Sequence, residues 1–306
     1  MLRCIVHDGV EEMQAEIDIA RRFGGVSRLY GDAGLAKLQV AHVVVIGIGG
    51  VGSWAAEALA RNAVGSITLI DLDNIAESNV NRQIHALEGE FGKAKVTAMA
   101  ERIRAINPSS IVREIEDFIT PENVAKLLNF KCDVIVDCID DAKAKIALAE
   151  FCKSAKTPLI MAGAAGGRLD PTRIKTADLS AVTGDKLLAK VRNQLRRDYS
   201  SPKASNAKKS LKFGITCVYS DELVMQPNEV CALEKSTNIE DDATGLKHSS
   251  AGLRSNIHAG AGDVKNVIKK TGAIAGLNCA GYGSSVCVTA PFGFVAAQLA
   301  IILIIA

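Results

Sequence analysis

A glycine-rich turn is the first feature of the sequence that could do chemistry. Residues 43–52 read Val-Val-Val-Ile-Gly-Ile-Gly-Gly-Val-Gly, so an apolar strand runs into Gly47, Gly49, Gly50 and Gly52. In this spacing the first glycine permits a tight turn, the second lets phosphates approach the backbone, and the third lets a helix pack on the strand. The start of that helix adds partial positive charge. The turn therefore predicts a nucleotide site without specifying the nucleotide.

Cations and amides follow this turn where a redox dinucleotide would not need them. Residues 78–83 read Ser-Asn-Val-Asn-Arg-Gln and contain Asn81 and Arg82, while Lys95 lies at the start of the next predicted helix. A lysine is mildly unfavourable at a helix start, which favours a binding role for Lys95, whereas Lys93 fits an ordinary solvated lysine. Cleavage of ATP needs its negative charges neutralised. The set therefore indicates ATP chemistry and disfavours an NAD-linked dehydrogenase.

Carboxylates lie at the ends of two predicted strands. Asp71 and Asp73 end one of them, near the position where an acid holds ribose hydroxyls. We favour Asp73 for that role, with Asp71 as the alternative. Asp140 follows another strand, where a carboxylate could hold Mg²⁺ between phosphates. Capping of a helix is the ordinary explanation for an acid there, and it suits Asp141 better than Asp140.

A parallel sheet would bring these residues to one edge. Apolar runs rich in Val and Ile alternate with amphipathic stretches through the first half of the chain. The pattern predicts an α/β fold, a Rossmann-like, doubly wound and mostly parallel sheet with an irregular C-terminal extension. The predicted strands are 43–47, 66–71, 111–116, 133–138 and 158–163. The predicted helices are 53–63, 93–106, 121–129 and 141–155.

The pattern changes near residue 170. Residues 1–170 are expected to hold an N-terminal arm and the ATP-binding core, and residues 171–306 a substrate-facing extension of the same globular unit. Residues 164–168 are expected to form a flexible turn, and the polar stretch 235–270 a mobile loop.

The end of the chain, residues 284–306, carries no charge. Pro291 and Gly293 are expected to divide it into a short strand and a helix of about a dozen residues. We favour a buried or dimer-interface helix, with membrane association of this tail as the alternative.

Composition limits the classes of partner. A net charge of only +2 means that a nucleic acid would need a local basic patch. The eight cysteines form no Cys-x-x-Cys pair, so no structural zinc is expected, and a reducing cytoplasm is the simplest compartment. Cys217 lies in an apolar run, which favours packing over a role as nucleophile.

Together the motifs resemble those of the ubiquitin-activating-type adenylyltransferases, the superfamily of the ThiF, MoeB and HesA proteins. The shared motifs, between residues 20 and 165, are Gly-Ile-Gly-Gly-Val-Gly, Asp-Leu-Asp-Asn-Ile, Ser-Asn-Val-Asn-Arg-Gln, Gly-Lys-Ala-Lys and Asp-Cys-Ile-Asp-Asp. Arg-Phe-Gly-Gly from residue 22, Gly-Gly-Arg-Leu-Asp-Pro from residue 166 and Thr-Ala-Pro-Phe-Gly from residue 289 are similar to the tRNA threonylcarbamoyladenosine dehydratases. The resemblance thus extends over most of the chain.

The resemblance implies roles for these residues. Asp73 would bind ribose, Asn81, Arg82 and Lys95 would contact phosphates, and Asp140 would hold Mg²⁺ or orient the reacting phosphate. A homodimer is implied, in which an N-terminal arginine reaches the partner's site. Arg28 is our first choice for it and Arg22 the second. The implied reaction is the ATP-dependent cyclisation of N6-threonylcarbamoyladenosine in tRNA through a carboxyl adenylate.

A basic stretch is the surface that such a tRNA would need. Residues 186–212 carry nine Lys and Arg against one acid. The residues expected to bind tRNA are Lys190, Arg192, Arg196, Arg197, Lys208 and Lys209, and a solvated basic helix is the alternative.

Two rival functions remain within the same superfamily. One is activation of a ubiquitin-like sulphur-carrier protein, which the lack of paired zinc-binding cysteines weakens. The other is a non-catalytic, nucleotide-sensing partner of a cysteine desulphurase system, with its sulphur-acceptor protein.

Overall fold

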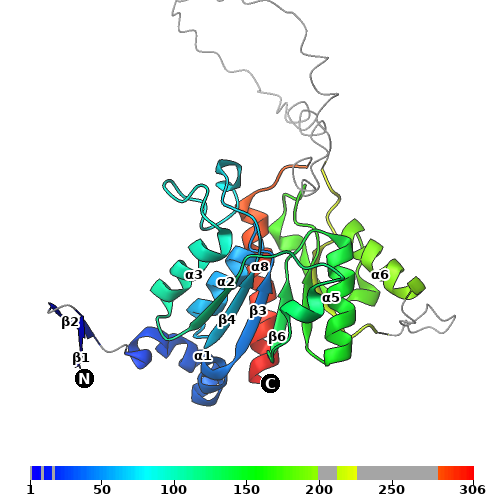
Figure 1. Ribbon diagram of the computed structural model, residues 1–306. Coiled ribbons are helices and arrows are strands. Elements are labelled where there is room, and N and C mark those ends of the chain that lie inside the picture. Colours follow the sequence, from blue (N-terminus) through cyan, green and yellow to red (C-terminus); the bar gives the residue numbers. More distant parts are fainter. Residues whose placement is uncertain (1, 8–9, 16–17, 199–211, 226–281) are drawn as a thin grey trace, which may run out of the picture.

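The computed structural model describes residues 2–7, 10–15, 18–198, 212–225 and 282–306 (Figure 1). A seven-stranded sheet, in the order β5-β4-β3-β6-β7-β9-β8, forms its centre. All neighbouring strands of this sheet are parallel except β8 and β9. The strands are β3 (His42–Ile46), β4 (Ser66–Ile70), β5 (Ile111–Ile115), β6 (Val134–Asp137), β7 (Leu159–Ala162), β8 (Ile174–Asp178) and β9 (Thr216–Ser220).

Helices cover both faces of this sheet (Figure 1). One face carries α2 (Gly52–Arg61), α3 (Lys95–Ile106) and α8 (Val286–Ile305), and α1 (Ile19–Val40) packs beside α8. The other face carries α4 (Val124–Leu127), α5 (Ala142–Ala155) and α6 (Lys186–Asp198). A separate antiparallel hairpin of β1 (Leu2–His7) and β2 (Val10–Ala15) lies at the N-terminal end.

Alternate residues of the central strand β3 enter two separate cores. Val43 and Val45 pack with α2, α3 and α8, whereas Val44 and Ile46 pack with α5 and α6. All four are at most 2% exposed. Each contributes about 1.5–3 kcal/mol through burial. Burial on both faces explains why these strands read as continuous apolar runs.

The order in which strands are added to the sheet reverses at β3. From this strand β4 and β5 extend to one side, and β6 and β7 extend to the other. In open α/β sheets ligands bind at such a switch point, outside the carboxyl ends of the strands. The glycine turn follows β3 and Asp140 follows β6, so the structure brings both to this edge, at the top of Figure 1.

The predicted elements of the first half are confirmed, each within a few residues. The exception in length is the predicted helix 121–129, which is helical only over Val124–Leu127. The elements that were not predicted include α1, β8 and β9. α1 contains Gly24, Gly25, Gly31 and Gly34, and glycine is a poor helix former, so its periodicity was hidden.

The division expected in the C-terminal segment is wrong. α8 is one helix of 20 residues with Pro291 inside it. A Cβ at Gly293 would lie 2.5 Å from Val51 O and 2.9 Å from Ala55 N, so this glycine lets α8 cross α2 closely. Tertiary packing of this kind offsets the hydrogen bond that the proline removes.

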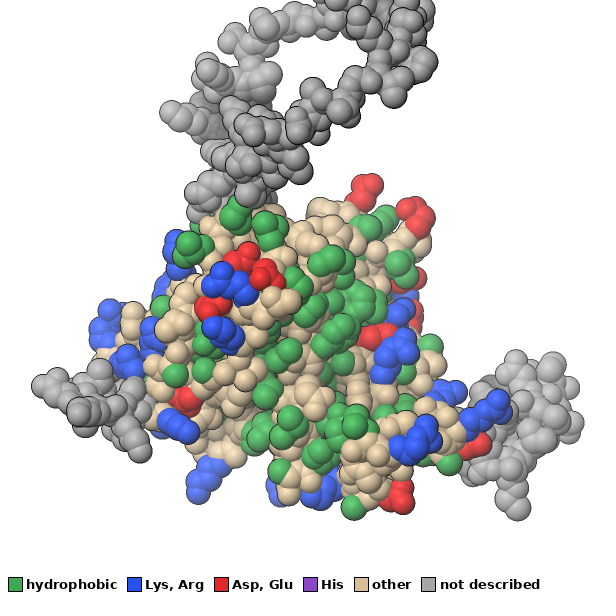
Figure 2. Space-filling model, turned by 180° about the vertical axis from the view of Figure 1, so that it is seen from behind, with side chains coloured by type: hydrophobic (Ala, Val, Ile, Leu, Met, Phe, Trp, Pro, Cys, Tyr) green, Lys and Arg blue, Asp and Glu red, His purple; other side chains and the backbone are tan. Residues whose placement is uncertain are grey.

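α8 is long and apolar enough to cross a membrane by length and composition alone. Half of its most apolar stretch is buried inside the protein, which is ordinary for a core helix. Phe294, Ile302 and Leu303 on its outer side are 45–47% exposed. Figure 2 shows hydrophobic side chains gathered along the middle of the face from which α8 is seen.

The turn expected to be flexible at residues 164–168 is instead fixed by a buried ion pair. Arg168 is 2% exposed, and its Nη2 lies 3.8 Å from Asp185 Oδ2. Asp185 also accepts a hydrogen bond from Ala164 N at 2.9 Å. Glycines in a turn signal permissive backbone geometry, but here side chains from later in the chain remove the freedom. The loop at 235–270 lies outside the described residues.

Candidate nucleotide-binding site

The glycine turn adopts a backbone conformation that other residues would strain. Gly47 has φ +83° and donates its N–H to Ile70 O at 2.8 Å. A Cβ at Gly52 would lie 1.8 Å from Gly47 O, so α2 starts in direct contact with the turn. The first turn of α2 has no acidic residue, and Val51 provides no side-chain cap. Ser53 N donates to Gly49 O at 3.1 Å, and no side chain of α2 competes with an anion at this helix start.

The two aspartates that follow β4 have different surroundings. Asp71 is 7% exposed and accepts hydrogen bonds from Ile48 N at 2.6 Å and Asp73 N at 2.9 Å. Burial raises the pKa of Asp71, while Lys95 and the two N–H groups oppose that rise. The Asp73 side chain is 54% exposed. Asp71 thus braces the glycine turn, and Asp73 is the carboxylate that can meet a ligand.

Lys95 joins these acids to the start of α3. Its Nζ lies 2.7 Å from Asp73 Oδ2 and 3.9 Å from Asp71 Oδ1, and its side chain is 7% exposed. The first turn of α3 holds no acid that would offset the helix dipole. The two aspartates supply that negative charge from outside the helix. A phosphate at this edge would compete with Asp73 for the ammonium group.

Arg82 and Asn81 reach the glycine turn from the loop between β4 and α3. The Nη1 of Arg82 donates to Ser78 O at 2.9 Å and to Asn81 Oδ1 at 3.0 Å. A Cβ on Gly50 would lie 3.1 Å from Arg82 Cγ, so the arginine stem lies directly on the turn. Asn81 Nδ2 donates to Ser284 O at 2.7 Å, which ties this loop to the start of α8.

The carboxylates at the end of β6 divide in the same way as those after β4. Asp137 is fully buried, and its Oδ1 lies 3.0 Å from Lys145 Nζ of α5. Burial raises the pKa of Asp137, and Lys145 opposes that rise. Asp141 caps α5 by accepting Ala144 N at 2.8 Å, as predicted. Asp140 lies between these two acids in the sequence, and it neither pairs with Lys145 as Asp137 does nor caps α5 as Asp141 does.

Asp140 is exposed at the rim of the site. Partial loss of hydration is the largest cause of the raised pKa of Asp140. The charges of Asp141 and Asp73 raise this pKa further, and the charge of Lys145 lowers it. Acids of like charge around one point favour a cation between them. Within the described ranges no three His, Cys, Asp or Glu side chains form a metal site. A metal at Asp140 would therefore need oxygens from a ligand.

A buried histidine beside Lys95 was not predicted. His85 is 3% exposed, and neither ring nitrogen has a hydrogen-bond partner among the described residues. Burial lowers the pKa of His85 to about 4, and Lys95 and Arg102 contribute to the same shift. The imidazole is therefore neutral at neutral pH. The one sequence signal that could have predicted a histidine at this site is the position of His85 three residues after Arg82.

The N-terminal arginines lie away from the glycine turn of their own chain. Arg22 Nη1 donates to Ile106 O, at the end of α3 opposite Lys95, at 2.8 Å. Arg28 belongs to α1, which lies at the bottom of Figure 1, whereas the glycine turn lies at the top.

The predicted basic surface contains both exposed and packed side chains. Lys190 and Arg197 are exposed on α6. Arg192 Nη1 donates to Val182 O at 2.6 Å, and the guanidinium of Arg196 lies 5.6 Å from the ring centre of Phe213. Lys208 and Lys209 lie outside the described residues.

The cysteines near the site have the surroundings of packed thiols. Cys217 on β9 is completely buried, and burial raises its pKa. Burial raises the pKa of Cys138 to about 12. Nucleophilic cysteines have lowered pKa values, so these two side chains fit packing.

The family model of the ThiF family matches residues 23–304. The tRNA threonylcarbamoyladenosine dehydratase of Escherichia coli (strain K12) is 41% identical over 285 residues, 92% of this chain and 92% of that relative. That of Haemophilus influenzae is 46% identical over 232 residues, 75% of this chain and 87% of that relative.

The fold is also similar to that of a solved structure. The E. coli tRNA N6-threonylcarbamoyladenosine dehydratase in complex with ATP has a TM-score of 0.73 and 37% identity, over 95% of this chain and 97% of that one. The match with the family model covers most of the chain, and the resemblance of the motifs is thereby confirmed. The protein belongs to the ThiF family.

Proposed function

We propose that this protein is an ATP-dependent tRNA threonylcarbamoyladenosine dehydratase that works through a carboxyl adenylate. The observation that carries the proposal is the end-to-end match with dehydratases of that name, one of them solved with ATP. The site adds physical support, because Arg82 lies on the glycine turn, α2 starts there without an acidic residue, and Lys95 pairs with the acids that follow β4.

The reaction divides into two steps. The threonyl carboxylate attacks the α-phosphorus of ATP, the bond to pyrophosphate breaks, and an acyl adenylate forms. The carbamoyl group of the same nucleoside then attacks the activated carbonyl, the bond to AMP breaks, and a ring closes with the net loss of one water. Both groups belong to one nucleoside, so proximity assists the second step.

The side chains at the carboxyl edge would divide the work on the nucleotide. Asp73 would hold the ribose, while Asn81, Arg82, Lys95 and the turn Gly47–Gly52 would contact phosphates. The cations would stabilise the charge that develops as pyrophosphate leaves. Asp71 would act indirectly, by bracing the turn.

Magnesium fits the donor set at this edge. Asp140 is an exposed carboxylate whose pKa neighbouring acids help to raise, and oxygen ligands of this kind suit Mg²⁺ together with phosphate oxygens. When bound, the ion would neutralise phosphate charge. Asp140 would hold it or orient the reacting phosphate.

A homodimer would complete the site. Arg28 belongs to α1, which lies at the end of the molecule opposite the glycine turn in Figure 1, so it would act in the partner's site, with Arg22 as the alternative. Val80, Leu87 and Phe294 are exposed apolar side chains that line, with Trp54, a cavity of about 740 Å³, and they offer a surface for a second copy.

The tRNA would lie along α6. Lys190 and Arg197 are exposed there, and phosphate contacts from them would give salt-dependent affinity. A tRNA substrate agrees with a cytoplasmic protein. The rival acceptors, a sulphur-carrier protein or a sulphur-acceptor partner, gain no support from the packed cysteines described above.

Incubation with ATP, Mg²⁺ and tRNA bearing N6-threonylcarbamoyladenosine tests the proposal. We expect AMP and pyrophosphate to form in step with a nucleoside that has lost one water, measured by mass spectrometry. AMP released only with a Gly-Gly-tailed protein would instead support the sulphur-carrier function.

A further inference from the structure

Two stretches far apart in the sequence meet at one glycine beside the site. Met225 N donates to Gly167 O at 2.8 Å, and Gly167 N donates to Gly283 O at 3.0 Å. Gly167 has φ +69°, and a Cβ there would lie 2.6 Å from Val224 Cγ1 and 3.2 Å from Tyr282 Cβ. Only glycine lets the three segments approach this closely.

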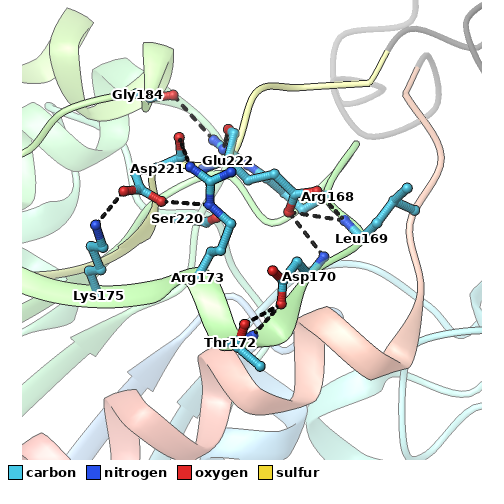
Figure 3. A network of polar contacts seen from close by, with 10 residues as sticks. All are labelled: Arg168, Leu169, Asp170, Thr172, Arg173, Lys175, Gly184, Ser220, Asp221 and Glu222. Atoms are coloured by element: carbon cyan, nitrogen blue, oxygen red, sulfur yellow. Dashed lines mark hydrogen bonds and ion pairs between the residues drawn. The ribbon is translucent and has the colours of Figure 1, made fainter.

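A polar network fixes this junction (Figure 3). The Glu222 carboxylate accepts hydrogen bonds from Leu169 N and Asp170 N, each at 3.1 Å. Arg168 donates to the carbonyl oxygens of Glu222 and Gly184 and is paired with Asp185 beneath them. The backbone at residues 167–170 is therefore held from both sides.

Large apolar side chains project from this fixed junction. Tyr282 is 42% exposed, Leu169 is 59% exposed and Leu223 is 85% exposed. Single exposed apolar residues are ordinary, but these three come from three segments joined at Gly167. We call them the Tyr282 platform.

The platform is tied to the residues proposed to hold phosphates. Asn81 Nδ2 donates to Ser284 O at 2.7 Å, and Val286 N donates to Asn81 O at 3.1 Å. Ser284 lies two residues after Tyr282, and two residues of extended chain span at most about 7 Å. The platform therefore lies close to the phosphate end of the site.

The sheet places the platform on the side away from the ATP ribose. Asp73 follows β4, on one side of the glycine turn, whereas residues 163–167 follow β7, on the other. A carboxylate that attacks the α-phosphate would enter from the second side. Its own base, a few bonds away, would then lie over the junction at Gly167.

We propose that the Tyr282 platform receives the purine base of the tRNA nucleoside whose carboxylate is adenylated. This rests on the proposed function. Unstacked bases of RNA are recognised by stacking on aromatic side chains, with apolar neighbours completing the contact. The ring of Tyr282 would supply the stacking surface, and Leu169 and Leu223, exposed on the two adjoining segments, would add apolar contacts.

Substitutions of Tyr282 distinguish the contribution of its aromatic ring from that of apolar volume alone. With modified tRNA and saturating ATP, Tyr282→Leu is expected to raise KM for the tRNA at least about ten-fold. Tyr282→Phe, which keeps the ring, is expected to stay within about two-fold of the wild type. ATP affinity by calorimetry stays unchanged in both. Ile111→Ala, which removes an exposed apolar side chain on β5 at the opposite edge of the sheet, is the control with unchanged KM.

A second measurement does not depend on turnover. Tyr282→Trp fluorescence is expected to be quenched by free N6-threonylcarbamoyladenosine, after subtraction of the Trp54 signal of the wild type. An unchanged KM for Tyr282→Leu, or no quenching at Trp in that position, overturns the platform while the wild type still converts tRNA. A wild type that binds ATP and leaves the modified tRNA unchanged overturns the proposed function instead.

Discussion

The two halves of the carboxyl edge use their charged side chains differently. At the ends of β4 and β6, one carboxylate of each cluster is buried and structural while another is exposed, as in Asp71 against Asp73 and Asp137 against Asp140. At the ends of β7 and β9, acids and bases engage one another, as in Arg168 with Asp185. Both halves contain ion pairs, but the first half also leaves Asp73 and Asp140 exposed to a ligand, whereas in the second half Arg168 and Asp185 fix the shape of the backbone.

The largest expected effect lies in the second half. Arg168→Met leaves Asp185 buried without its cation, which is expected to reduce the free energy of unfolding by about 3–5 kcal/mol. Denaturant titration measures it. The double variant Arg168→Met/Asp185→Asn removes the buried charge but keeps an oxygen for the N–H groups that Asp185 accepts, so it is expected to recover part of the loss. Arg173→Met, an exposed partner of Asp221, is expected to cost at most about 1 kcal/mol. Equal losses from both arginines would contradict the contrast between buried and exposed pairs.

In the first half the expected loss is of activity. Asp140→Ala is expected to lower turnover about 10²–10³-fold with the fold kept, because it removes the carboxylate proposed to hold Mg²⁺ or to orient the reacting phosphate. Rates of AMP formation and circular dichroism measure the two quantities. Asp141→Ala next to it removes a helix cap, so it is expected to cost about 1 kcal/mol of stability and to leave turnover near the wild-type value. Loss of turnover in Asp141→Ala and loss of stability in Asp140→Ala would contradict these roles.

His85 links stability to pH. Its folded pKa is about 4, below the ordinary 6.5, so the neutral ring contributes stability that is complete above pH 6.5 and is lost as the pH falls toward 4. The loss amounts to about 3 kcal/mol over that window. His85→Gln is expected to flatten the stability profile between those pH values. A profile as steep as that of the wild type would place the pH dependence elsewhere.

The smallest expected effect concerns the surface of α6. Reversing the charges of Lys190 and Arg197 to Glu is expected to weaken tRNA binding and to reduce its dependence on salt, because counterion release falls with each lost phosphate contact. Filter binding across a salt series measures both. Lys126→Glu/Lys131→Glu, with the same change of charge on exposed sites elsewhere, is the control. An identical salt slope in both variants would locate the RNA surface away from α6.

Sequence patterns predicted the nucleotide half well and the other half poorly. Apolar runs and glycine spacing have a local physical cause, so β3 to β7 and the turn at Gly47 could be predicted. The different tasks of Asp71 and Asp73 could not, because burial depends on Ile48 and Lys95. Arg168 was misjudged for the same reason, since Asp185 and Glu222 reach it from later segments.

Gly167 fixes the positions of two segments that are far apart in the sequence. Met225 and Gly283 are both hydrogen-bonded to Gly167, so the distance between Met225 and Gly283 is set at that residue. A side chain at Gly167 would therefore displace both segments at once, because its Cβ would meet Val224 and Tyr282.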